Sequence, residues 1–352
     1  MKTVQYKCPN CGGELKFNAE KQLFSCEYCL SDFTEEQVKQ IFKKNEETDL
    51  SEKNADKAVK DFEEHTNLYT CPSCGAEIMA EETTSATFCY YCHNPVILSG
   101  RLSGEYKPGR VIPFKVTREA AVDSFKRWCK SKWFIPKDFK SKRQLEKITG
   151  VYVPFWIADC KTNAGLNAVG KQIRSWTAGD YKYTETREFA VSRRADIKVK
   201  GVPADGASKI PDELMEAIEP FDYKESREFS MSYLSGFIAN KYDVDKGKVF
   251  PRVRQRVNDA CVSVLNESIG NYSIMVGKNV HIDILSTDWQ YMLLPVWFMT
   301  YKYGGKMYSF AVNAQNGKTD GIPPLSYPRL LSFCGIIAAA SAALFGIIGG
   351  LL

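Results

Sequence analysis

The chain has 352 residues, and 44% of them are hydrophobic, which is ordinary for a globular protein and sufficient for two or three domains. Its formal net charge is +5, but residues 1–100 carry 10 Lys/Arg against 17 Asp/Glu, while residues 101–352 carry 37 against 25. The acidic front end argues against nucleic-acid binding there, because such modules present a basic face to phosphate. No signal peptide precedes the first cysteines, so we expect the body of the protein in the cytoplasm.

A C-x2-C-x14-C-x2-C motif occurs twice in the front end. Four thiolates on two tight turns suit a tetrahedral zinc ion, so the spacing predicts two structural Zn2+ ions in two small ribbons, over 1–33 and 69–100. Disulfide hairpins or iron–sulfur clusters are the alternatives, and nothing indicates the secretion that disulfides would require. The expected metal ligands are Cys8, Cys11, Cys26, Cys29, Cys71, Cys74, Cys89 and Cys92.

The region between the two motifs, 34–68, is charged and poor in apolar residues. Thr34 is a good N-cap and is followed by acidic residues, so we expect a short helix there. Beyond it the segment reads as a solvated helical linker.

Residues 101–328 predict a mixed α+β middle domain. A short strand over 111–114 precedes a helix capped by Thr117, whose apolar stripe is Ala121, Phe125, Trp128 and Cys129. We expect further strands over 151–156, 181–189, 279–285 and 292–312, and further helices over 211–216, 229–241 and 253–264.

The last 23 residues, 330–352, contain no charged side chain. At about 1.5 Å per residue, a helix of this length crosses the roughly 30 Å hydrocarbon core, so the pattern predicts a transmembrane helix; a buried soluble helix is the alternative. Arg329 and Lys318 lie upstream, which predicts a tail-anchored, single-pass cell-membrane protein whose body faces the cytoplasm. Gly346 and Gly350 have the spacing of a helix-pairing motif, which leaves a homo-oligomer open.

The fold class expected from these elements is multidomain α+β: two four-cysteine ribbons, a mixed α+β middle domain and a C-terminal transmembrane helix. The sequence gives little sign of an enzyme. It has three histidines (His65, His93 and His281) and lacks the common phosphate-loop, dinucleotide, metalloprotease and serine-hydrolase motifs. A zinc site with four cysteine ligands is also closed to substrate.

Three features together resemble a known family: the paired cysteine motifs, the Val153-Pro154-Phe155-Trp156-Ile157 segment, and the run from Leu294-Pro295-Val296-Trp297 to Lys318. They resemble bacterial TFIIB-type zinc-ribbon membrane proteins, often labelled as relatives of the primosomal helicase. Where the family usually reads Asn-Gly-Gln-Thr-Gly, this chain reads Asn313-Ala314-Gln315-Asn316-Gly317. Some members belong to phage-shock-type envelope-stress operons, which implies a role in recruiting a soluble partner and, through it, a phage-shock-protein-A-type membrane-repair protein. The resemblance also implies zinc at the same eight cysteines.

The expected function is therefore a membrane-anchored cytoplasmic adaptor that recruits protein partners through its zinc ribbons. Removing the zinc should unfold the ribbons and leave the middle domain folded. The basic 101–150 segment could face anionic lipid through Arg118, Lys126, Lys130 and Lys132, although a solvated helix face is the plainer interpretation. The alternative is a membrane-tethered nucleic-acid-binding protein that uses the basic stretch 126–147 and its interleaved aromatic residues Trp128, Trp133, Phe134 and Phe139.

Overall fold

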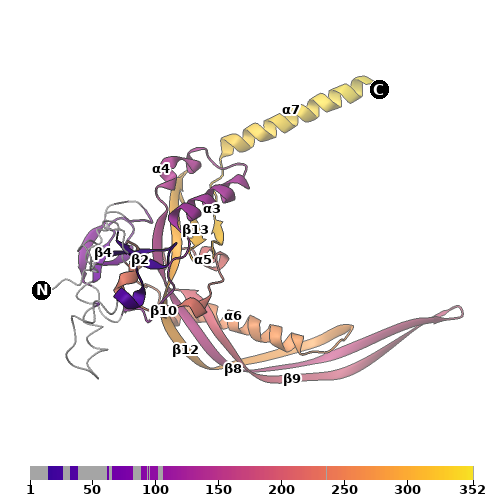
Figure 1. Cartoon of the computed structure of the whole chain (residues 1–352). Helices are drawn as coiled ribbons and strands as arrows, with labels where there is room; N and C mark the ends of the chain where they lie inside the picture. The colour runs from indigo at the N-terminus through magenta and orange to yellow at the C-terminus, as the bar shows by residue number, and fades with distance from the viewer. Residues whose placement is uncertain are drawn as a thin grey trace, which may run out of the picture. The chain divides into compact units, whose positions relative to one another are not determined.

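The computed structural model describes residues 15–26, 32–38, 62, 66–81, 89–92, 94, 96–101, 106–234 and 236–351 (Figure 1). The chain divides into two compact units: unit 1 comprises residues 1–154, 207–242 and 293–352, and unit 2 comprises residues 155–206 and 243–292. Two long strands, β8 (Thr149–Ala178) and β12 (Ile274–Tyr303), each contribute residues to both units. The predicted linker lies mostly outside the described residues, but 35–38 form the expected helical turn. There the Gln37 backbone N–H donates to the Thr34 hydroxyl at 3.2 Å, and the Thr34 backbone N–H donates to the Gln37 side-chain oxygen at 2.8 Å.

Unit 1 is built on a sheet whose strand order is β10-β7-β12-β8-β11-β5-β4-β6, with β13 and β14 continuing from β12. A separate three-stranded sheet of order β1-β2-β3 precedes it in the chain. The strands are β1 (Leu15–Asn18), β2 (Leu23–Cys26), β3 (Asp32–Phe33), β4 (Thr66–Thr70), β5 (Glu77–Glu81), β6 (Ile97–Arg101), β7 (Arg110–Val111), β10 (Arg227–Glu228), β11 (Ile238–Asn240), β13 (Lys306–Asn313) and β14 (Thr319–Gly321). The helices are α3 (Arg118–Lys130), α4 (Lys142–Leu145), α5 (Asp212–Ala217) and α7 (Tyr327–Leu351), with 3-10 turns at Asp138–Lys140, Tyr223–Glu225 and Met231–Leu234.

Unit 2 is a long, three-stranded β arrangement with one helix. Strand β9 (Tyr181–Asp205) folds back on β8 in an antiparallel hairpin that pairs Phe155 with Asp205 at one end and Ala178 with Tyr181 at the other. Helix α6 (Lys246–Glu267) packs on β9. Its buried stripe has the four-residue spacing of one helix face and consists of Val249, Val253, Val257, Cys261 and Leu265.

The core of unit 1 is aromatic. Phe114 is fully buried and stacks on Phe237 with ring centroids 4.0 Å apart. The rings of Tyr152 and Trp297 meet Phe114 edge-on at 5.0 and 5.3 Å. Because these rings come from four distant chain segments, this cluster holds the sheet and its flanking loops together.

Several expected elements are confirmed locally. Thr117 caps α3 by accepting the Ala120 N–H at 3.3 Å, and the stripe residues Ala121, Phe125 and Cys129 are buried. The helix expected over 229–241 is wrong. Gly236 adopts φ +82°, a conformation that ends helical geometry, and the following residues form β11, parallel to β8 and antiparallel to β5.

The predicted fold class is wrong as a whole. Strands β4, β5 and β6, which surround the second cysteine motif, belong to the same sheet as β7, β8 and β10–β12 instead of forming a separate small ribbon. The described body is dominated by this large sheet. The sequence missed this because strand pairing between β5 and β11 joins residues about 160 positions apart, which no local pattern encodes.

The predicted transmembrane helix is also wrong. Helix α7 covers the expected segment. Among the described residues, none of the helices combines the length and apolar character needed to cross a membrane. This finding overturns the single-pass, tail-anchored membrane localisation and the orientation derived from it. At its base, α7 is held to unit 1 by Arg329, which donates to the Ile135 carbonyl at 2.5 Å, and by Phe333 against Phe134.

We expect Phe114→Ala to lower the free energy of unfolding of unit 1 by about 3–5 kcal/mol, because it leaves a cavity between three aromatic rings. Met307→Ala, at a half-exposed position of β13, should change it by less than about 1 kcal/mol. Urea denaturation followed by tryptophan fluorescence compares the two, and equal losses would contradict the assignment of the core.

Candidate metal centre

The first half of the centre is a tight turn directly after β4. Cys71 and Cys74 stand at its ends, and Gly75 follows with φ +70°, which only glycine adopts without strain. The Gly75 N–H donates to the Cys71 carbonyl at 2.8 Å, and the Cys71 N–H donates to the Ala76 carbonyl at 2.9 Å. The turn therefore places both sulfurs on one side before β5 begins.

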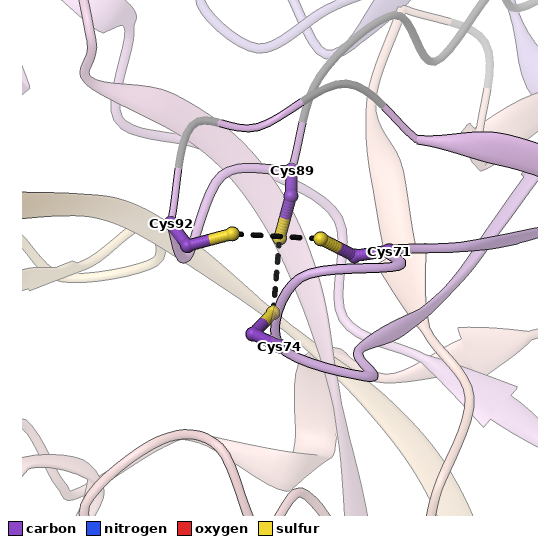
Figure 2. A group of neighbouring side chains, drawn as sticks. All are labelled: Cys71, Cys74, Cys89 and Cys92. Atoms are coloured by element: carbon purple, nitrogen blue, oxygen red, sulfur yellow. Dashed lines mark hydrogen bonds between the residues drawn. The ribbon is translucent and has the colours of Figure 1, made fainter.

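The second half is the Cys89-Tyr90-Tyr91-Cys92 turn, closed by a 2.7 Å bond from the Cys89 N–H to the Asn94 carbonyl. The two turns bring their sulfurs together, as Figure 2 shows. All four lie within 4.8 Å of one another, with Cys71–Cys92 at 3.4 Å and Cys74–Cys89 at 3.7 Å. A tetrahedral zinc ion with Zn–S bonds of about 2.3 Å needs sulfurs about 3.8 Å apart.

These distances are far longer than the about 2.05 Å of a disulfide bond, and the four cysteines are free thiols. The disulfide alternative therefore fails for this motif. Four sulfurs within 4.8 Å of one another are a donor set that suits zinc, so Cys71, Cys74, Cys89 and Cys92 form a group that could bind a metal ion.

Backbone N–H groups point at the sulfurs. Burial raises the pKa of Cys89, although the N–H groups of Cys92 and Tyr91 oppose this, and burial likewise raises the pKa of Cys74 against the Ala76 N–H. At Cys92 burial is outweighed by the Asn94 N–H and the neighbouring thiols, which lower the pKa to about 7. A bound cation would complete the deprotonation of all four, since only thiolates ligate the metal.

The Asn94 side chain links the two turns. Its amide nitrogen donates to the Ser73 hydroxyl at 2.7 Å and lies 3.6 Å from the Cys92 sulfur. One side chain therefore contacts both halves of the sulfur cluster. Contacts of this kind orient metal ligands and reduce the negative charge on sulfur.

The second turn is seated on the large sheet of unit 1. Tyr90 and Tyr91 are buried, with ring centroids 6.0 and 5.9 Å from Phe298 of β12. The Thr300 hydroxyl, two residues along the same strand, lies 3.2 Å from the Tyr90 carbonyl oxygen and 2.8 Å from that of Tyr91. The Asn240 amide of β11 donates to the Tyr91 hydroxyl. The cysteine cluster is therefore attached to the core of unit 1.

The first cysteine motif is only partly visible. Cys26 ends β2, the second strand of a hairpin with β1 that pairs Leu15 with Cys26, while Cys8, Cys11 and Cys29 lie outside the described residues. Of the histidines, His65 and His93 also lie outside them. His281, in unit 2, is exposed and contacts Asp283 at 2.9 Å. Of the remaining thiols, Cys129, Cys160 and Cys261 are buried, whereas Cys334 is exposed.

Comparison with known proteins gives one informative result. Over 347 residues, 97% of this chain and 96% of the relative, the chain is 33% identical to the uncharacterized protein YdjG of Bacillus subtilis strain 168. The chain belongs to the YdjG family. No family model matches the chain, and no solved structure matches it. Since the alignment spans nearly the whole of both chains, we expect YdjG-family members to share the arrangement of unit 1 around the cysteine cluster.

The attachment of the cluster to the sheet changes what metal removal should do. A separate ribbon would unfold alone, but here loss of the metal frees a turn that fills part of the core. We expect Zn2+ at about 100 times its dissociation constant to stabilise metal-free protein by about 2.7 kcal/mol, in the main unfolding transition of unit 1. Calorimetry with and without Zn2+ measures this, with Cys74→Ser losing the part of the response that comes from this site and the exposed Cys334→Ser keeping the full response. An unchanged main transition would contradict the coupling.

The link made by Asn94 also predicts a defined loss. We expect Asn94→Ala to weaken zinc binding by about tenfold, because outer contacts to ligand sulfurs typically contribute 10–100-fold to metal affinity. Competition with a chromogenic chelator measures the affinity, and Asn167→Ala, at an exposed position of β8, serves as the control. Equal affinities in the two variants would contradict a role for Asn94 at the metal.

Proposed function

We propose that this YdjG-family protein is a non-enzymatic adaptor that recruits protein partners and uses zinc as a structural element. The observation that carries the proposal is the closed sulfur cluster of Cys71, Cys74, Cys89 and Cys92. Four thiolates fill a tetrahedral zinc ion, which leaves no position for substrate or activated water. A structural metal of this kind stabilises the conformation of a surface to which a protein partner can bind.

We further propose a second structural zinc at Cys8, Cys11, Cys26 and Cys29. The hairpin of β1 and β2 supports this, since it brings the chain back antiparallel to deliver Cys26 at its end, as a ribbon with this spacing requires. Ring contacts of Phe17 and Phe24 with Tyr233, at 5.6 and 5.9 Å, attach this hairpin to the rest of unit 1. Two zinc ions per chain are therefore expected.

The nucleic-acid alternative keeps only part of its aromatic platform. Phe139 is buried against Phe125, and Trp128 packs on Phe310 at 5.2 Å, whereas Trp133 is 73% exposed. The basic face proposed for lipid is weakened in the same way, because Arg118 donates to the carbonyls of Ile148 and Glu146. Protein is the partner class that remains best supported, and the acidic front end agrees with it.

The cellular role that we propose is in the response to envelope stress. It rests on the resemblance of the cysteine motifs and the Pro-x-Trp segments to zinc-ribbon proteins of phage-shock-type operons. Under that role the partner is a soluble protein that in turn engages a phage-shock-protein-A-type repair protein.

The adaptor role predicts that partner capture depends on the metal. We expect full-length protein to carry about two zinc ions and to retain a discrete partner, whereas Cys74→Ser should carry one zinc fewer and lose that partner. Metal analysis and affinity capture from the same cells measure both, with Cys334→Ser as the matched cysteine control. Full capture by Cys74→Ser, or zinc-dependent turnover of a substrate, would contradict the proposal.

A further inference from the structure

Unit 2 exposes one edge strand. Within the described residues β9 pairs only with β8, so its other edge has no strand beside it over a length of 25 residues. Most strands in globular proteins are about 5–6 residues long, and long open edges are normally blocked because they pair with other chains. The edge therefore requires an explanation.

The outer half of this edge is also apolar in places. Tyr181, Tyr183 and Phe189 point to one face of the sheet and are 72%, 46% and 39% exposed. Helix α6 does not cover them. It ends near Arg193, whose guanidinium donates to the carbonyl of Ser268, the residue that caps α6, at 3.1 Å. A partner strand beside β9 would cover these rings.

We propose that β9 pairs antiparallel with β9 of a second copy of this chain, about a two-fold axis at Phe189. In such a pair each residue faces the one equally distant on the other side of the central residue, on the same face of the joined sheet. The centre at Phe189 places Glu185 opposite Arg193, Lys182 opposite Asp196, and Asp180 of the preceding turn opposite Lys198.

Charge selects this register. Like charges directly opposite one another destabilise a strand pair, and opposite charges stabilise it. Among centres from Thr186 to Arg193, only Thr186 and Phe189 avoid every like-charged pair, and the Phe189 register forms three oppositely charged pairs where the Thr186 register forms one, Glu185 with Arg187. The like-charged pairs in the remaining registers are Arg187 with itself, Glu188 with itself, Lys182 with Arg194, Arg187 with Arg193, Lys182 with Lys198, Lys182 with Lys200, Glu188 with Asp196, and Arg193 with itself.

The apolar side chains fit the same register. Tyr181 faces Ile197, Tyr183 faces Ala195, and Phe189 faces its own copy, which removes the exposed rings from water. The edge is therefore complementary to itself in both charge and apolar surface.

The present contacts of the charged residues do not prevent pairing. Glu185 contacts the neighbouring Arg187 at 2.9 Å, and Asp196 accepts from Asn163 at 2.7 Å, both at exposed positions. Exposed contacts of this kind contribute little and are readily exchanged for a cross-strand partner. The inference concerns unit 2 alone and does not rest on the metal or on the adaptor role.

The test is a charge swap in the full-length protein, followed by sedimentation velocity over a range of concentrations. Because each pair occurs twice across the axis, E185K or R193E alone should raise the dimer dissociation constant at least about tenfold. The double variant E185K/R193E should restore it to within about threefold of the parent. Asn167→Lys, on the inner strand β8, is the control and should have no effect.

A cross-link fixes the register independently. Phe189→Cys should form a disulfide-linked dimer on mild oxidation, because directly opposite residues have Cα atoms about 4.5–5.5 Å apart. Thr184→Cys should form none above the parent chain, since its two copies would lie about 33 Å apart along the strands. A monomer at all concentrations, a dimer unaffected by the charge reversals, failure of the double variant to restore pairing, or absence of the Phe189→Cys cross-link would each overturn the proposal.

Discussion

The arrangement of unit 1 depends on how one short turn meets one long strand. Tyr90 and Tyr91 lie between two cysteines of the sulfur cluster, yet their rings pack on Phe298 and their carbonyls approach the hydroxyl of Thr300. Buried carbonyls need partners, so these contacts determine both the position of the turn and the face of β12 that receives it. The sulfur cluster therefore does not form an independent module. Its geometry and the packing of the sheet are stabilised together.

Because of this coupling, a structural metal at the cluster would stabilise unit 1 as well as the two cysteine turns. In an isolated ribbon the metal replaces a hydrophobic core that is too small to form alone. Here the second cysteine motif adds strands β4, β5 and β6 to a sheet with its own aromatic core around Phe114. Metal binding then contributes to the stability of a large surface. An adaptor whose binding surface is stabilised by the metal would respond to zinc supply throughout unit 1.

The sequence predicted the features that depend on residues close together in the chain. The C-x2-C-x14-C-x2-C pattern identified four residues whose sulfurs lie within 4.8 Å, and Thr117 marked the start of α3. It did not predict the partners of those residues. Thr300 and Asn240 are ordinary strand residues more than 140 positions away from the turn, and they gain their roles only through pairing of β12 and β11 in the sheet. The C-terminal helix forms where the apolar run predicts it, but among the described residues no helix has the length and apolar character to cross a membrane.

Strand β9 illustrates information that lies in the sequence but cannot be read without the structure. Its alternation of charged and apolar residues is compatible with any exposed strand until the structure shows which edge is open. Only then can the order of charges be interpreted, because a two-fold axis places β9 antiparallel to β9 of a second copy and pairs Glu185 with Arg193. Charged residues usually protect an edge from pairing. When their order is self-complementary, the same residues disfavour most other registers and favour one, so that protection against aggregation and specific assembly arise from one pattern.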